Sequence, residues 1–331
     1  MSDANAPDGS ALSIAIIGVE DMDKSLLFYR DVIGLTANRC TSWQGKAFES
    51  LWHLPPGSKA DAVFCELPTC EVGRVLLLDF KMGKRKRIRQ AKASCMVGLV
   101  NLNFYTDDIH KDSTLLQSKG YTFWSKPTNY TMSESAGAPT EVVFEGPDGV
   151  PINLVELNDP NPATSVGRMA IYVRKHGRTS TGYTPVVTSN HSTHDIDAAT
   201  EFYKRVLKCD VLINEVMDTA SQNYFLRLPE KARTAVRFMK GNHMFGKIAL
   251  SAPLNYDCED LVKDQHAPNI GYLCQSYMIS NLSAAASSCA DQQVEIYTSE
   301  MDITIPGIGS CRTMIVKCPG SGTLQQLIEA N

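Results

Sequence analysis

The chain has 331 residues, 43% of them hydrophobic, which is long enough for two domains with cores of their own. Its net charge of −4, spread over 21% charged residues, argues against a general nucleic-acid-binding protein. The polar N-terminus predicts no secretory signal, no apolar run is long enough to span a bilayer, and the ten cysteines form no CxxC pair. We therefore expect a cytoplasmic monomer or homodimer with free thiols that binds a small molecule, and neither a membrane nor a nucleic-acid partner.

The N-terminal part of the chain predicts a short tail followed by a strand–helix unit. Residues 1–11 have the composition of a flexible tail, and the apolar run SIAIIGV predicts a buried strand. In the next stretch, VEDMDKSLLFYRDVIG, Asp21 or Asp23 can cap a helix whose apolar residues recur at helical spacing. Gly34 suits the left-handed residue that ends such a helix. Further strands are expected at 35–40, 47–54, 62–67 and 74–80.

The same pattern occurs four times along the chain at an almost constant spacing. The expected helix caps are Asp21, Asp108, Asp195 and Asn281, so that successive steps are 87, 87 and 86 residues. A regular step with matching local sequence indicates internal duplication into four modules. The basic run KMGKRKRIRQAK between the first two modules is interpreted as a solvated linker.

The best domain boundary lies between the second and third modules. Residues 158–183 are rich in Pro, Ser, Thr, Gly and Arg and predict a linker. We therefore expect one domain of two modules at 12–157 and a second domain of two modules at 184–331.

The repeated unit resembles the vicinal oxygen chelate superfamily. It combines strand, helix and three strands with the patterns D-x6-FY-x2-V[IL] and, in the second module, a PDG turn before the last strand. That family includes glyoxalase I, extradiol dioxygenases, epimerases, fosfomycin-modifying enzymes and metal-free drug-binding proteins. The resemblance covers about residues 12–329. It implies an α+β fold of four βαβββ modules, paired into two half-open barrel domains that surround the substrate.

The resemblance also predicts where a metal ion would bind. Metal-binding members carry a ligand, usually His, on each first strand, seven residues before the cap, and a Glu on the last strand. In this chain the residues seven positions before the caps are Ile14, Asn101, Thr188 and Cys274. The corresponding positions on the last strands are near Leu76, Asn153, Ile248 and Gln326. Amides without charge are poor ligands for such an ion. We therefore predict that the usual metal site is lost and that no cofactor is needed; the alternative is one divalent metal ion.

Polar, uncharged side chains take the place of the missing ligands. Strand alternation puts Asn101, Asn103 and Tyr105 on one face of the second module's first strand. Such groups among apolar walls suit a pocket for an oxygenated, partly aromatic small molecule, or else they bind ordered water in a vestigial cavity. The predicted substrate-binding residues are Asn101, Asn103, Asn153, Thr188, Asn190 and Cys274.

The predicted catalytic acid is Tyr105, because its parity places it inside the cavity and a phenol can donate to a developing oxyanion. Glu49 and Glu66 flank strands of the first module and would be bases if burial raised their pKa, although such residues more often lie at the surface.

Three histidines are further catalytic candidates. His194 stands beside Asp195, a pairing that raises imidazole basicity, although the sequence slightly favours a solvent-facing residue near the cap. His191 has the wrong parity for the cavity on a regular strand, but a bulge would turn it inward. His53 follows a strand that lines the cavity in the family.

These features predict a glyoxalase-like enzyme, a metal-independent lyase or isomerase that moves a proton beside a carbonyl or phenol of a small hydrophobic or aromatic compound. One alternative is a metal-dependent extradiol-type dioxygenase or glyoxalase. Another is a non-catalytic protein that binds or sequesters a small molecule.

Overall fold

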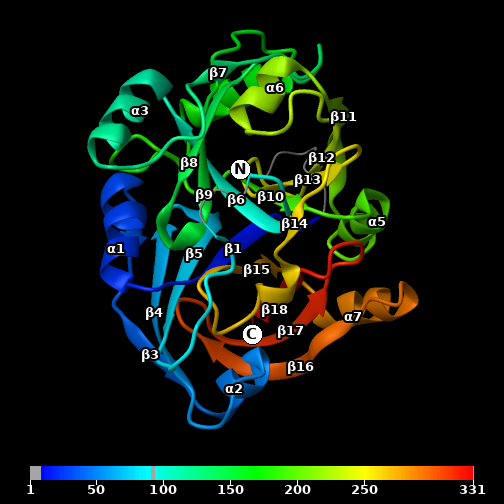
Figure 1. Cartoon of the computed structure of the whole chain (residues 1–331). Coiled ribbons are helices and arrows are strands. Elements are labelled where there is room, and N and C mark those ends of the chain that lie inside the picture. Colours follow the sequence, from blue (N-terminus) through cyan, green and yellow to red (C-terminus); the bar gives the residue numbers. More distant parts are fainter. Residues whose placement is uncertain (1–8, 91–93, 331) are drawn as a thin grey trace.

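The computed structural model describes residues 9–90 and 94–330, which form two nine-stranded mixed sheets with helices around them (Figure 1). The first module comprises β1 (Leu12–Gly18), α1 (Met22–Leu26) continued by the π-helix η1 (Leu27–Val32), β2 (Thr36–Ala37), β3 (Thr41–Gln44), α2 (Lys46–Trp52), β4 (Lys59–Leu67) and β5 (Cys70–Phe80). The second comprises β6 (Met96–Thr106), α3 (Ile109–Ser118), β7 (Thr128–Asn129), β8 (Thr140–Glu145), η2 (Pro147–Gly149) and β9 (Pro151–Glu156).

The second half of the chain repeats this order. The third module comprises β10 (Thr188–Ser192), α5 (Ile196–Arg205), β11 (Asp210–Met217), α6 (Ala220–Phe225), β12 (Thr234–Lys240) and β13 (Lys247–Pro253), followed by β14 (Glu259–Asp260) and η3 (Val262–Asp264). The fourth comprises β15 (Gly271–Met278), α7 (Leu282–Asp291), β16 (Ile296–Ile305), β17 (Gly309–Lys317) and β18 (Leu324–Ala330).

The four predicted helix caps are confirmed. The side chains of Asp21, Asp108, Asp195 and Asn281 each accept a hydrogen bond from a first-turn backbone N–H, at 2.8–3.2 Å. Each cap residue itself has extended backbone geometry, as a residue at the start of a helix requires. The structure therefore repeats the strand–cap–helix unit at the predicted spacing.

The pairing of the modules differs from the expectation. One sheet has the order β16-β17-β18-β15-β1-β5-β4-β2, with β3 also on β4, and so joins modules one and four. The other has the order β11-β12-β13-β10-β6-β9-β8-β7, with β14 on β6, and joins modules two and three. We call these curled sheets the 1–4 half-barrel and the 2–3 half-barrel. The expected pairing of neighbouring modules within 12–157 and within 184–331 is wrong, because the free edge of β1 pairs with β15 and that of β6 pairs with β10.

The two sheets pack against each other through one face of each. Ala15 and Ile17 of β1 belong to the same buried cluster as Leu102 and Phe104 of β6. A hydrogen bond of 3.0 Å also joins Ser189 Oγ on β10 to the Tyr272 hydroxyl on β15. The opposite face of each sheet is therefore the concave face of its half-barrel.

The predicted linker at 158–183 contains a helix, α4 (Ser165–Val173). Thr164 caps it, and Met169 and Val173 pack against Tyr105 and other residues at one end of the 2–3 half-barrel. The connection thus closes part of the half-barrel as well as joining the modules. Within the described residues, no helix has the length and apolar character needed to cross a membrane.

Candidate functional site

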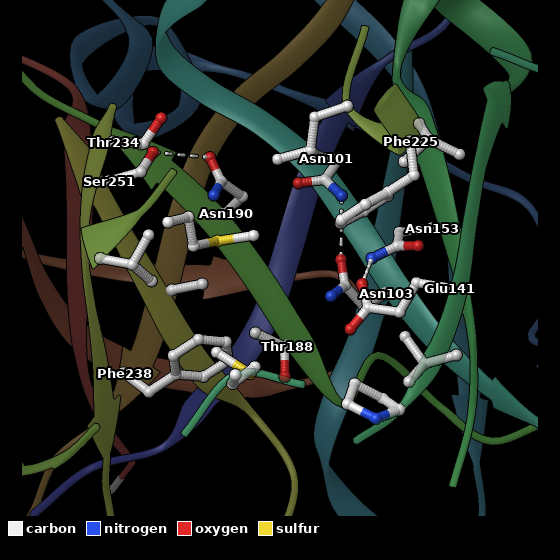
Figure 2. A pocket seen from close by; sticks show the side chains of 18 of the residues that line it. Asn101, Asn103, Glu141, Asn153, Thr188, Asn190, Phe225, Thr234, Phe238 and Ser251 are labelled. Atoms are coloured by element: carbon white, nitrogen blue, oxygen red, sulfur yellow. Dashed lines mark hydrogen bonds between the residues drawn. The ribbon is translucent and has the colours of Figure 1, made fainter. Parts of the chain in front are cut away.

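A cavity of about 190 Å³ opens inside the 2–3 half-barrel. Its walls come from both modules. Figure 2 shows Asn190, Thr234 and Ser251 on one side of the space, facing a second group on the other side. This second group contains Asn101, Asn103, Glu141 and Asn153. The remaining walls are largely aromatic and aliphatic, among them Phe225, Phe238 and Tyr130.

The structure places five of the six residues predicted to bind substrate in this cavity. On neighbouring strands, Asn103 lies in register with Asn153 on one side and with Thr188 on the other, so the three form a polar row. Asn101 Nδ2 donates to Asn103 Oδ1 at 2.9 Å, and Ser251 Oγ donates to Asn190 Oδ1 at 3.5 Å. Cys274 is the exception, because β15 belongs to the other half-barrel, where its thiol is buried in an apolar cluster.

A carboxylate that the sequence analysis missed stands at the edge of this polar row. Glu141, on β8, accepts hydrogen bonds from the Tyr130 hydroxyl at 2.9 Å and from Asn153 Nδ2 at 2.6 Å. Burial raises the pKa of Glu141, against the lowering effect of these two hydrogen bonds. In the described part of the chain it is the one acidic side chain that lines the cavity. Strand alternation in EVVFE places Glu141 and Val143 on the same face of β8, and this pattern could have predicted that Glu141 lines the cavity.

Asn153 connects Glu141 to the row of amides. Its side chain is 4% exposed, and its Oδ1 atom has no hydrogen-bond partner within the described residues. A buried carbonyl oxygen without a partner costs free energy that a donor on a bound molecule would recover. The cavity therefore offers a ligand at least one acceptor that the fold leaves unused.

Tyr105 lies at the end of the cavity that α4 closes. Its ring contacts Phe245 edge-on at a centroid distance of 6.3 Å. Burial raises the pKa of the phenol well above its ordinary value, and the charge of Glu141 adds to this effect. The hydroxyl therefore remains a neutral hydrogen-bond donor across the physiological pH range.

A second cavity residue that the sequence patterns did not reveal is Lys247, at the start of β13. It lines the cavity, is 5% exposed and lies in register with Thr188. Its Nζ donates to the Met244 carbonyl oxygen at 2.5 Å. Burial lowers the pKa of Lys247 to about 7, and the positive charge of Lys240 contributes. Alternation with Ala249 and Ser251 along KIALSAP was the available signal.

The structure places the three candidate histidines outside the cavity. The His191 ring contacts the hydroxyl of Tyr203 on α5 at 3.0 Å, and those of Ser321 at 2.7 Å and Thr323 at 2.9 Å in the loop before β18. The pairing of β10 with β6 is irregular between Ser189 and His191, but this irregularity does not turn the ring inward. Burial lowers the pKa of His191 to about 3, so the imidazole is neutral.

The other two histidines lie at the surface. His194 contacts Asp260 at 3.3 Å and not Asp195, whose carboxylate instead caps α5. His53 ends α2, stacks on Tyr297 at a centroid distance of 4.1 Å and belongs to the 1–4 half-barrel. Glu49 is one of the carboxylate candidates in that half-barrel, and its side chain accepts a hydrogen bond from the Gly57 backbone N–H.

The donor set of the cavity does not fit the metal site of the family. Seven residues before its two helix caps, the 2–3 half-barrel has Asn101 and Thr188. On the last strand of module two it has Asn153. The carboxylate of Glu141 is already hydrogen-bonded to two side chains. No three His, Cys, Asp or Glu side chains converge anywhere within residues 9–90 and 94–330. Because a divalent ion needs several charged or imidazole ligands, these residues would hold it poorly.

Comparisons with known proteins agree with the fold. Residues 11–154 match the family model described as Glyoxalase/Bleomycin resistance protein/Dioxygenase superfamily. The structure of glyoxalase I from Zea mays is similar, with a TM-score of 0.60 at 13% identity, over 97% of this chain and 92% of that one. A putative dioxygenase from Bacillus subtilis has a TM-score of 0.53 at 12% identity, over 98% of this chain and 86% of that one.

At such identities the two structures support the fold alone, and no curated protein matches the chain by sequence. The family model covers modules one and two, and modules three and four repeat their strand–helix pattern within the same two sheets. Residues 11–154 thus belong to the glyoxalase, bleomycin resistance protein and dioxygenase superfamily, and the whole chain is a four-module form of the same fold.

Proposed function

We propose that the chain is a metal-independent lyase or isomerase that acts in the cavity of the 2–3 half-barrel. Its substrate is a small hydrophobic or aromatic oxygenated compound, from which it moves a proton beside a carbonyl or phenol group. The observation that carries the proposal is Glu141, a half-buried carboxylate with a raised pKa in a cavity whose other polar side chains are mostly uncharged.

Glu141 has the properties of a general base. A carboxylate whose pKa is raised by burial is a stronger base than one in water, and proton transfer is most efficient when that pKa approaches the working pH. The hydrogen bonds from Tyr130 and Asn153 fix the orientation of the carboxylate. It would remove a proton from the carbon beside the substrate's carbonyl, which leaves an enolate.

The polar row supplies donors for that enolate oxygen. Asn103 has its Oδ1 engaged by Asn101, so its amide N–H groups are the part of the side chain that can serve a ligand. Tyr105 and Thr188 add hydroxyl groups to the same cavity. Return of the proton from Glu141 to a different carbon gives an isomer, whereas departure of a group on the β-carbon gives an elimination product.

Hydrogen–deuterium exchange tests the proposal without knowledge of the natural substrate. Protein treated with a chelator is incubated in D2O with phenylpyruvate, 2-hydroxyacetophenone and 2-tetralone, and exchange at the carbon beside the carbonyl is followed by proton NMR. Faster exchange than in buffer with at least one compound supports the proposal. Binding without accelerated exchange supports the sequestering protein instead.

Metal analysis of the purified protein separates the remaining alternative. One tightly held iron, manganese, nickel or zinc ion per chain, with exchange abolished by its removal, would favour the metal-dependent dioxygenase or glyoxalase.

A further inference from the structure

The cavity of the 2–3 half-barrel contains a buried cation without a counter-ion. Lys247 is 5% exposed and lines the cavity, and its Nζ has a backbone carbonyl, that of Met244, as its hydrogen-bond partner. Within the described residues no carboxylate lies within ion-pair distance of it. A buried ammonium group is normally paired, because desolvation of an unpaired charge is costly.

The neighbouring groups do not neutralise this charge. Lys240 and His243, which affect it electrostatically, are a cation and an imidazole. Glu141 lies on β8, four strands away in the order β13-β10-β6-β9-β8. At about 4.8 Å per strand this is roughly 19 Å along the sheet, so that the two charges stand at opposite sides of the cavity.

We infer that Lys247 is an anion subsite, which binds the carboxylate of a small aromatic or alicyclic acid. This inference rests on the proposed function and narrows its substrate class. Thr188, in register with Lys247 on the next strand, adds a hydroxyl beside the ammonium group. One cation among uncharged donors suits a monoanion better than a phosphate, whose two charges would need more partners.

The subsite also orients the ligand. A carboxylate held at Lys247 directs the rest of the molecule across the polar row of Thr188, Asn103 and Asn153 toward Glu141. The like charge of Glu141 disfavours the reverse orientation. The apolar walls, which include Phe225 and Phe238, then receive the ring. The lowered pKa of Lys247 agrees with a cation that a bound anion would stabilise.

A matched pair of ligands tests the subsite independently of turnover. Binding of 2-naphthoate and of the neutral, nearly isosteric 2-naphthamide is measured by calorimetry at pH 6.5, with the whole chain. We expect wild-type protein to bind the naphthoate at least tenfold more tightly than the amide. Lys247→Met should reduce this ratio to twofold or less and leave the affinity for the amide within twofold of wild type.

Two variants serve as controls. Lys240 is a cation on the adjacent strand β12, and its side chain does not line the cavity. Lys240→Met should therefore keep the tenfold preference for the naphthoate. Glu141→Gln should also keep the tenfold preference for the naphthoate. If this variant loses deuterium exchange but keeps the preference, the base and the anion subsite are shown to be separate groups.

Three results would overturn the inference. They are equal affinities of wild type for the two ligands, an unchanged preference in Lys247→Met, and failure of both ligands to bind at millimolar concentration. Reductive trapping of 2-naphthaldehyde on Lys247 without naphthoate binding would likewise contradict it, because the lysine would then act as a nucleophile.

Discussion

The two half-barrels share one topology but differ in what fills them. In the 1–4 half-barrel, α2 directs Phe48, Leu51 and Trp52 into the buried cluster on the concave face, where they pack with Ile14 and Ile16. In the 2–3 half-barrel, the two first-strand positions that are Cys274 and Ile14 in the 1–4 half-barrel are Asn101 and Thr188, and a cavity remains. The difference shows that interior side chains, and not the scaffold, decide which half can hold a ligand.

A cation at equivalent positions makes the comparison sharper. Arg74 lies in register with Ile14, as Lys247 does with Thr188, and both cations are less than a tenth exposed. The guanidinium carbon of Arg74 stands 5.3 Å from the centre of the Phe64 ring, a cation–π contact within the fold. Among the described residues Lys247 makes no such contact with an aromatic ring, and its side chain faces the cavity.

The largest expected effect concerns Glu141. Glu141→Gln keeps the shape and an acceptor for Tyr130 but removes the base, so the exchange rate should fall by about 10²–10⁴-fold. Glu49→Gln, in the 1–4 half-barrel, is the matched control and should leave the rate unchanged. A similar loss in both variants would show that the exchange is not carried out in the 2–3 half-barrel.

The filled half-barrel should be the more sensitive to truncation of an aromatic side chain. Trp52→Ala removes a fully buried ring, and we expect the free energy of unfolding to fall by about 3–5 kcal/mol. Phe225→Ala, beside the existing cavity, should cost roughly half as much, because fewer packed neighbours lose contact. Urea unfolding measures both, and equal losses would contradict the contrast between the half-barrels.

Lys247 should make stability depend on pH. Its pKa is about 7 in the folded protein, against an ordinary value of 10.5, so the unfolded chain binds the proton more tightly. The resulting destabilisation is full below pH 7 and disappears as the pH rises toward 10.5. Lys247→Met should therefore raise the free energy of unfolding by about 2–4 kcal/mol at pH 7.

Urea titrations of wild type and Lys247→Met at several pH values between 6.5 and 10 measure this effect. The gap between the two proteins should narrow as the pH rises. If the difference in free energy of unfolding stays constant with pH, or if the variant is less stable than wild type at pH 7, burial of the Lys247 ammonium group does not destabilise the fold.

The smallest effect is expected at His194. Its side chain is 59% exposed and its partner Asp260 is 50% exposed, and such surface pairs contribute less than about 1 kcal/mol. His194→Ala should leave deuterium exchange unchanged and alter stability within about 0.5 kcal/mol. A large loss of exchange would return this histidine to the list of catalytic candidates.

Local patterns in the sequence predicted local features well. The caps at Asp21 and Asp195 and the inward face of Asn101 and Asn103 follow from spacing and alternation, which depend on a few neighbouring residues. Pairing of β1 with β15 could not be predicted, because four similar first strands offer similar edges.

The missed residues have a different explanation. Glu141 and Lys247 are charged types that usually lie at the surface, and the curling of the sheet brings both into the cavity. His191 shows the reverse error, since α5 and the loop before β18 supply three hydroxyl partners that no local pattern reveals.

A crystal structure of the protein soaked with 2-naphthoate tests most directly the claim that the 2–3 half-barrel is the functional one. We expect a ligand in that cavity, with its carboxylate at Lys247 and its ring toward Glu141. A ligand bound inside the 1–4 half-barrel, with the cavity of the 2–3 half-barrel left to solvent, would contradict it.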